Sequence, residues 1–174
     1  MWLAETAVDD DTLRVLAENG SKFTILSPFQ AKSIRKQGDP NWHDVSWGNI
    51  DPARSYRYYI KSAPDKYIDL FFYDGAISKS VAFDELLTDG NKFVRRLKDG
   101  VSYERNYPQL VNIATAGESY GHHTKFGGMA LAYALSSKAK EAGFTITNYA
   151  EYLEKYASDW ELDIKDVSSW SCFH

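Results

Sequence analysis

Short apolar runs alternate with amphipathic segments along the chain, and turn residues bound most of them. A run of about four to eight β-prone residues between turn signals is typical of a strand buried on both faces. We expect neighbouring parallel strands at Met1–Glu5, Phe23–Leu26, Ile68–Tyr73 and Leu110–Thr115. Further strands are predicted at Phe144–Ile146 and Trp160–Ile164, with an edge strand in the tyrosine-rich stretch Asn49–Ile60.

The segments between these runs carry helix signals. Three aspartates, Asp9 to Asp11, supply N-cap carboxylates for a helix over Thr12–Asn19, and Gly20 is a natural stop. Other helices are predicted at Ser80–Leu87, Gly90–Leu97, Phe126–Ala142 and from Thr147-Asn148 to about Tyr156. The polar stretch Gln30–Asp44 indicates a long loop.

Strands and helices that alternate in this way predict an α/β fold, with a mainly parallel sheet and helices outside it. Such a sheet is either open or closed as a barrel. Four predicted strands end on polar groups, at Glu5, Ser27, Asp74 and the turn around Glu118. Chemistry in these folds takes place beyond the carboxyl ends of the strands. We therefore expect Glu5 and Ala116–Glu118 on one side of the sheet.

Composition narrows the function without naming it. A chain of 174 residues with 44% hydrophobic residues is long enough for one domain with a real core. A net charge of −4 with no basic block argues against nucleic acid, and no apolar run is long enough for a membrane span. The single cysteine, Cys172, rules out an internal disulfide. Aromatic residues, at 15%, are frequent and suit both core packing and stacking on sugars.

The densest chemistry lies in the turn that follows Leu110–Thr115. It combines two glycines, which permit unusual backbone angles, with a carboxylate, a phenol and two imidazoles: Gly117, Gly121, Glu118, Tyr120, His122 and His123. An ordinary solvent-facing loop is the simpler interpretation. So many reactive side chains in one short turn favour a functional loop.

Two motifs match a known family. Trp2-Leu3-Ala4-Glu5 resembles the W-L-x-E motif of glycoside hydrolase family 57, whose members act mostly on α-glucans. The stretch Ala116 to Gly121, AGESYG, resembles the second catalytic motif of that family, D-x-E-x-[FY]-G. The surrounding segments ETAVDDDTL, KFTILSP, FFYDGAIS, GMALAYAL and SSWSC resemble a subgroup that carries an uncharacterised C-terminal domain.

The resemblance implies a fold and a mechanism. The family fold is an incomplete (β/α)7 TIM-like barrel, and residues 1–174 would be its C-terminal part, truncated at both ends. The implied mechanism is retaining, in which two carboxyl groups about 5–5.5 Å apart flank the glycosidic bond. The nucleophile of the family corresponds to Glu5. It would attack the anomeric carbon of an oligo- or polysaccharide.

The chain departs from the family pattern at its second carboxylate. Ala116 stands where the family has the general acid Asp, and a methyl group donates no proton. General acid–base catalysis contributes about 10²–10⁴-fold, so activity on ordinary glucans is expected to be impaired. Three further departures are Phe29 before Gln30-Ala31 where the subgroup has H-Q-A, Gly128 where it has F-G-D, and Thr124 for a third histidine.

The remaining polar and aromatic residues of the motifs are candidates for substrate binding: Trp2, Tyr73, Asp74, Glu118, Tyr120, His122 and His123. Glu118 suits a sugar-hydroxyl acceptor better than a replacement acid. For Trp2 and Tyr73, core packing is an equal alternative. For the two histidines, the alternative is helix capping or plain exposure. His174 belongs to a WSCFH segment that resembles the start of another family motif.

Two other functions stay open. A catalytically inactive carbohydrate-binding barrel follows directly from Ala116. A metal-dependent polysaccharide deacetylase needs Asp and His-x-x-x-His, whereas the four histidines, His43, His122, His123 and His174, lack that spacing. We expect no cofactor and no metal ion. The expected partners are a carbohydrate substrate, the rest of the barrel and a C-terminal domain, with no nucleic acid and no membrane, in the cytoplasm.

Overall fold

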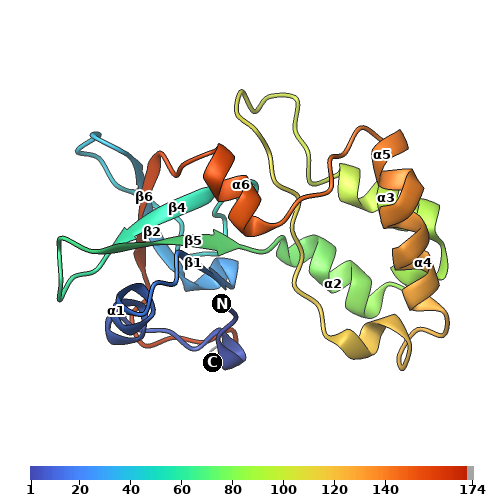
Figure 1. Ribbon diagram of the computed structural model, residues 1–174, viewed down its shortest axis with the longest axis horizontal. Coiled ribbons are helices and arrows are strands. Elements are labelled where there is room, and N and C mark those ends of the chain that lie inside the picture. Colours follow the sequence, from blue (N-terminus) through green and yellow to red (C-terminus); the bar gives the residue numbers. More distant parts are fainter. Residues whose placement is uncertain (172–174) are drawn as a thin grey trace. The chain divides into compact units, whose positions relative to one another are not determined.

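The computed structural model describes residues 1–171, so Cys172 and the expectation for His174 lie outside the described residues. Two compact units make up the chain (Figure 1). Unit 1 comprises Met1–Tyr73 and the segment from Tyr149 onward, and unit 2 comprises Asp74–Asn148.

Unit 1 is built on a six-stranded sheet with the order β1-β5-β4-β6-β2-β3. The strands are β1 (Phe23–Leu26), β2 (Ala31–Lys36), β3 (His43–Asp44), β4 (Ser55–Tyr59), β5 (Tyr67–Phe72) and β6 (Trp160–Ile164). The pairs β1–β5 and β4–β6 are parallel, which confirms that the predicted strands at 23–26 and 68–73 are parallel neighbours. The predicted strand Trp160–Ile164 is also confirmed.

The expectation of a mainly parallel sheet is wrong for this unit. Three of its five strand pairs, β2–β3, β2–β6 and β4–β5, are antiparallel, so the sheet is mixed. The reason is local, because residues 60–66 join β4 to β5 by a turn too short for a parallel crossover. β4 lies between β5 and β6, so it is an interior strand and no edge strand.

The stretch Gln30–Asp44 is no loop, since it contains β2 and β3. Its sequence hides the strands because one face of β2 is polar and largely open to solvent, with Lys32 and Arg35 among its residues. An apolar run marks only strands that are buried on both faces. A search for apolar runs therefore misses half-buried strands next to hairpin turns.

One face of the sheet packs against helix α1 (Asp10–Glu18) through buried Leu13 and Leu16. Phe71 of β5 packs against Tyr149 of helix α6 (Tyr149–Lys155), with 4.8 Å between the ring centroids. Both helices confirm the predicted segments. The core consists of residues from all the long strands, the largest being Tyr56, Tyr58, Ile68, Leu70 and Phe72.

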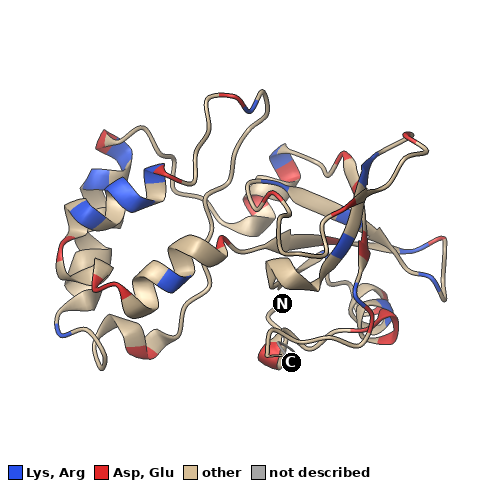
Figure 2. Cartoon of the chain, turned by 180° about the vertical axis from the view of Figure 1, so that it is seen from behind, with Lys and Arg blue, Asp and Glu red and all other residues tan. Residues whose placement is uncertain are grey.

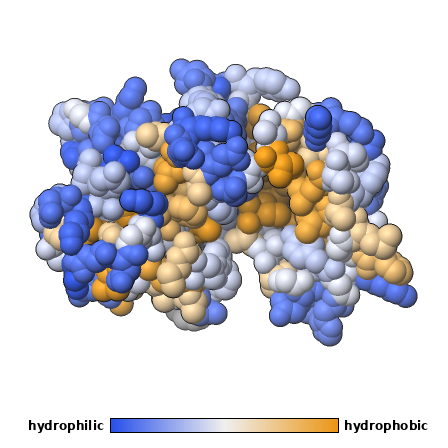
Figure 3. Space-filling model, viewed as in Figure 1, coloured by the Kyte–Doolittle hydropathy of each residue, from blue (hydrophilic) through white to orange (hydrophobic). Residues whose placement is uncertain are grey.

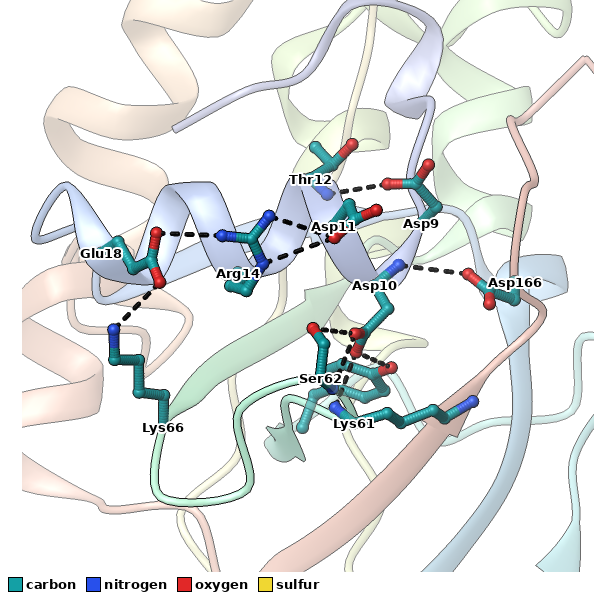
Figure 4. A network of polar contacts seen from close by, with 11 residues as sticks. Asp9, Asp10, Asp11, Thr12, Arg14, Glu18, Lys61, Ser62, Lys66 and Asp166 are labelled. Carbon is teal, nitrogen blue, oxygen red and sulfur yellow. Dashed lines mark hydrogen bonds and ion pairs between the residues drawn. The ribbon is translucent and has the colours of Figure 1, made fainter.

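A polar network fixes the start of α1 (Figure 4). Asp9 caps the helix by accepting a hydrogen bond from Thr12 N at 2.7 Å. Asp10 turns to the β4–β5 turn, where it accepts hydrogen bonds from Lys61 N, Ser62 N and Ser62 Oγ, at 2.8, 3.0 and 2.6 Å. Burial acts to raise the pKa of Asp10, but these hydrogen bonds outweigh it and hold the pKa below its usual value.

Unit 2 consists of helices α2 (Gly75–Phe83) and α3 (Gly90–Lys98) and a long third helix. The third helix runs from α4 (Gly127–Tyr133) through a π-helical turn (Ala134–Lys138) to α5 (Ala139–Glu141), which confirms the predicted long helix. The small core of unit 2 includes the buried residues Leu87, Phe93 and Ala134. Lys and Arg residues stand out on α3 (Figure 2), and apolar residues reach the surface near α4 (Figure 3).

Three predicted strands do not form. Met1–Glu5 ends in a short 3-10 helix, Ala4–Thr6, and Phe144–Ile146 has no regular structure. Leu110–Thr115 is no strand either, although Asp74 N donates to Asn112 O at 2.9 Å and Ala114 N donates to Ser78 Oγ at 3.1 Å. A short apolar run cannot distinguish a strand from a coil segment that packs on a helix.

Candidate functional site

Glu5 lies level with the carboxyl end of β1. The chain starts beside that strand, where Met1 N donates to Phe23 O at 3.1 Å and Thr24 Oγ1 donates to Met1 O at 2.8 Å. It then runs in the direction of β1, because Thr6 contacts Gln30, which follows the strand's end. In parallel architectures this end of a strand is where reactive groups gather.

The backbone at Glu5 and Thr6 is strained. Both residues have positive φ angles, 54° and 49°, a region that non-glycine residues seldom adopt and that suits a β-branched threonine least. Each such residue costs about 1–3 kcal/mol and persists where its surroundings hold it, which happens most often at functional sites.

Gln30 holds this strained turn. Its side chain is 1% exposed, its Oε1 accepts from Thr6 Oγ1 at 2.7 Å, and its Nε2 donates to Thr6 O at 2.8 Å. The same Oε1 also accepts from Ser27 N at 3.0 Å. Gln30 therefore ties the backbone after Glu5 to the end of β1.

Trp170 holds the Glu5 side chain. Its indole Nε1 donates to Glu5 Oε2 at 2.6 Å, and its backbone N donates to Glu5 O at 3.1 Å. Within residues 1–171, Glu5 Oε1 accepts no hydrogen bond, and the side chain is exposed. One carboxylate oxygen is thus held while the other is available to a substrate.

Trp2 joins the same cluster, since its ring lies 5.5 Å from the ring of Trp170 in an edge-on arrangement. The structure therefore brings the candidates Glu5 and Trp2 together through a residue that sequence reasoning missed. Trp170 belongs to the SSWSC segment, but the sequence of that segment does not predict a contact with Glu5.

Tyr73 and Asp74 follow β5. Tyr73 is half-buried, and its backbone N donates to Leu26 O at 3.4 Å, so it continues the pairing with β1. Asp74 is the N-cap of α2, with Oδ1 accepting from Ile77 N at 2.9 Å. The Asp74 carboxylate thus has a structural task, and one of its oxygens is already engaged.

The turn that begins at Ala116 lies in unit 2. Ala116 and Glu118 are exposed, and a 3-10 helix spans Gly117–Tyr120. Tyr120 is anchored, with its hydroxyl 2.7 Å from Thr115 Oγ1. The start of α4 packs tightly on this turn, since a Cβ on Gly127 would lie 3.1 Å from the Ser119 carbonyl oxygen.

His122 and His123 are exposed and adjacent, and their ring centroids lie 5.0 Å apart. Their backbone N atoms both donate to Glu118 O, at 3.0 and 2.9 Å. The turn therefore holds Glu118, Tyr120 and both histidines in one short segment, and their role as substrate contacts stays a prediction. Glu5 belongs to the other unit, so its expected position on the same side as Ala116 stays a prediction.

The described part of the chain contains no cluster of side chains suited to a metal ion. Residues 1–171 contain no group of three or more His, Cys, Asp or Glu side chains placed to hold an ion. No helix among them is long and apolar enough to cross a membrane.

Comparison with known proteins supports the family resemblance. Residues 1–165 match the family model described as glycosyl hydrolase family 57. The chain belongs to this family. No curated protein sequence matches it.

Two solved structures share the mixed α/β fold of this family 57 chain. An exo-type maltose-forming amylase from Pyrococcus sp. ST04 is 20% identical, with a TM-score of 0.68, over 99% of this chain and 29% of the amylase. The 4-alpha-glucanotransferase from Thermococcus litoralis is 15% identical, with a TM-score of 0.66, over 98% of this chain and 24% of the transferase. The chain thus spans less than a third of either neighbour.

Proposed function

We propose that this chain carries the nucleophile half of a retaining glycoside hydrolase or transglycosylase that acts on α-glucans. Family membership supports the reaction class, and the neighbours, named as an amylase and a glucanotransferase, support the substrate class. The observation that carries the proposal is the geometry at Glu5. A carboxylate on a strained backbone, with one oxygen held by Trp170 and the other open, suits a nucleophile.

In this proposal Glu5 Oε1 attacks the anomeric carbon of the sugar while the bond to the leaving oxygen breaks. The product is a glycosyl ester on Glu5, with the configuration inverted once. Water, or the hydroxyl of an acceptor sugar, then attacks the same carbon and releases Glu5, which restores the configuration. The Trp170 N–H stays on Oε2 and keeps the carboxylate oriented for both steps.

Protonation of the leaving oxygen is the impaired step. Ala116 occupies the motif position of the general acid, and its side chain has no proton to give. Glu118, exposed two residues later, is proposed as an acceptor for a sugar hydroxyl. Tyr120, His122, His123, Trp2, Tyr73 and Asp74 are proposed as further substrate contacts.

We also propose the finer architecture. The parallel pair β1–β5 and the segment beside β1 would belong to an incomplete (β/α)7 barrel, for which a longer polypeptide supplies the remaining strands and a C-terminal domain. The shares of 29% and 24% of the two neighbours support a larger whole. A cytoplasmic location is part of this proposal.

The experiment compares two substrate types in the polypeptide that carries the complete barrel. Maltoheptaose needs a protonated leaving group, whereas maltosyl fluoride does not, so only the fluoride should be turned over at a substantial rate. Ala116→Asp should raise the rate on maltoheptaose by about 10²–10⁴-fold. Glu5→Gln should abolish turnover of both substrates, and full activity of Glu5→Gln would refute the proposal.

A second function, an inactive carbohydrate-binding barrel, is favoured by Ala116 itself. It predicts a binding isotherm for maltoheptaose without turnover of maltosyl fluoride. If Ala116→Asp also gains no activity while the glucan still binds, the binding function is the better account.

A further inference from the structure

Unit 1 contains a pocket that none of the residues that hold Glu5 line. It has a volume of about 380 Å³ and opens on the sheet over β2, β4 and β6. Its wall is made of charged and aromatic side chains, chiefly Arg35, Trp42, Tyr59, Lys61, Glu161 and Asp163. The volume lies within the range of about 300–1,000 Å³ that small-molecule sites occupy.

The charges in the pocket cancel. Arg35 Nε donates to Glu161 Oε2 at 2.7 Å, and Lys61 Nζ lies 2.9 Å from Asp163 Oδ1. Figure 2 shows basic and acidic residues side by side along these strands. The wall carries two cations and two carboxylates, and Lys32, outside the wall, adds a third cation 3.0 Å from Asp163 Oδ2. Each of these cations is held against a carboxylate, so none is left to bind a phosphate, and the carboxylates are already engaged by cations. A neutral ligand with many hydroxyl groups fits this wall better.

The Lys61–Asp163 pair stays charged over a wide pH range. Burial acts to raise the pKa of Asp163, but hydrogen bonds and charges from Lys61 and Lys32 outweigh it and lower the pKa. The hydrogen bond to Asp163 in turn raises the pKa of Lys61. The fixed guanidinium, ammonium and carboxylates keep donors and acceptors beyond those used in the pairs. Such groups match the hydroxyls of a sugar ring.

Two aromatic rings complete the wall. Trp42 is 43% exposed, with the Arg35 guanidinium 4.6 Å from its ring centroid. Tyr59 is 40% exposed and lies beside Tyr67, with 6.2 Å between the ring centroids. Exposed aromatic faces beside fixed polar groups offer a flat apolar surface with hydrogen bonds at its edge. A pyranose, apolar on its faces and polar at its rim, has the complementary character.

We propose that this sheet pocket binds a neutral oligosaccharide, with Trp42 and Tyr59 against sugar faces and the Arg35–Glu161 and Lys61–Asp163 pairs on its hydroxyls. Such a site is separate from Glu5 and holds a glucan without cleaving it. It goes beyond the proposed activity, because it needs neither the nucleophile nor the missing acid.

Indole N–H signals in a ¹H–¹⁵N spectrum of the 174-residue chain test the proposal. Maltotetraose and cellotetraose are the neutral probes, and inorganic phosphate is the anionic one. The indole signal of Trp42, identified by its loss in Trp42→Phe, should shift saturably with at least one sugar and stay still with phosphate. Trp47, which is 83% exposed and outside the pocket wall, is the matched control and should not shift.

Two variants make the test specific. Glu161→Gln removes one of the four charges and should weaken sugar binding at Trp42 at least fivefold, while Glu5→Gln should leave the Trp42 shift unchanged. The remaining indole signals report whether each variant stays folded. A Trp42 signal that ignores both sugars, follows phosphate, or moves no more than that of Trp47 overturns the proposal. Failure of Glu5→Gln to abolish turnover would concern the nucleophile alone.

Discussion

The backbone at Glu5 and Thr6 places two residues where only strong local contacts keep them. A strain of about 1–3 kcal/mol at each position is offset by Gln30, which bonds both the hydroxyl and the carbonyl of Thr6. An unpaired buried amide would itself cost about 1–3 kcal/mol, so Gln30 and Thr6 depend on each other. The position of the proposed nucleophile is therefore set by a glutamine that never contacts its carboxylate.

At the same scale, Trp170→Phe removes the indole N–H that holds Glu5 Oε2 and keeps an aromatic ring beside Trp2. An exposed carboxylate without this donor samples more rotamers, so fewer encounters are productive. We expect kcat on maltosyl fluoride to fall about tenfold, equivalent to about 1.4 kcal/mol of transition-state stabilisation, with little change in KM.

Trp47→Phe is the control, because Trp47 is exposed and makes no contact with Glu5. Steady-state kinetics of both variants decide the role of Trp170. A rise in KM with unchanged kcat would mean that Trp170 binds sugar and does not position the nucleophile.

Among the elements, the attachment of α1 to the β4–β5 turn depends on Asp10. Its folded-state pKa is lowered against an unfolded value of about 3.9, so its contribution to stability is present above about pH 4 and is lost as the pH falls through the folded pKa. Asp10→Asn presents an amide N–H₂ to donors of Ser62 and Lys61 and should lower the free energy of unfolding by about 1–3 kcal/mol at pH 7.

Urea unfolding at pH 7 and near pH 3 measures this effect. The difference between the wild type and Asp10→Asn should shrink at the lower pH, because the unfolded state takes up a proton at Asp10 more readily than the folded state and part of the contribution of Asp10 to stability is lost. Asp11→Asn is the matched control, since Asp11 pairs with Arg14 at the surface and its replacement should change stability little. A difference between wild type and Asp10→Asn that is the same at both pH values would contradict this account.

Sequence patterns correctly predict a strand that is apolar along its length and a helix that begins at a capping carboxylate. The strand Phe23–Leu26 and the helix behind Asp9 follow directly from an apolar run and an N-cap carboxylate. β2 is missed because its charged face opens on the sheet pocket, and a polar stretch of this kind resembles a loop. Leu110–Thr115 is wrongly assigned because its apolar side chains pack in a helical unit and not in the sheet.

Within the candidate site, sequence motifs identify some residues, whereas other contacts arise only from the tertiary fold. Local motifs find Glu5 and the cluster of Glu118, Tyr120 and two histidines, since each lies within a few residues of sequence. The contact of Trp170 with Glu5 spans 165 positions and leaves no periodic signal. The positive φ angles at Glu5 and Thr6 arise from tertiary contacts, and no propensity of Glu or Thr favours them.

For the whole molecule, the family and the fold are established, and the activity is the proposal. Unit 1 holds Glu5, the proposed nucleophile, and the sheet pocket, and unit 2 holds the turn with Ala116, the proposed vacant acid position. A domain with an impaired acid and a separate sugar pocket would hold a glucan well and cleave it slowly. The proposed hydrolase activity and the proposed carbohydrate binding are therefore compatible in one molecule.

The most direct test of the central claim is covalent trapping of the nucleophile. The complete-barrel polypeptide is incubated with 5-fluoro-α-glucosyl fluoride, whose fluoride leaves without a proton and whose glycosyl ester hydrolyses slowly. Intact-protein mass spectrometry should show one added glycosyl unit, and peptide mapping should place it on Glu5. A label on another residue, or no label at all under these conditions, would contradict the assignment of Glu5 as the nucleophile of a retaining glycosidase.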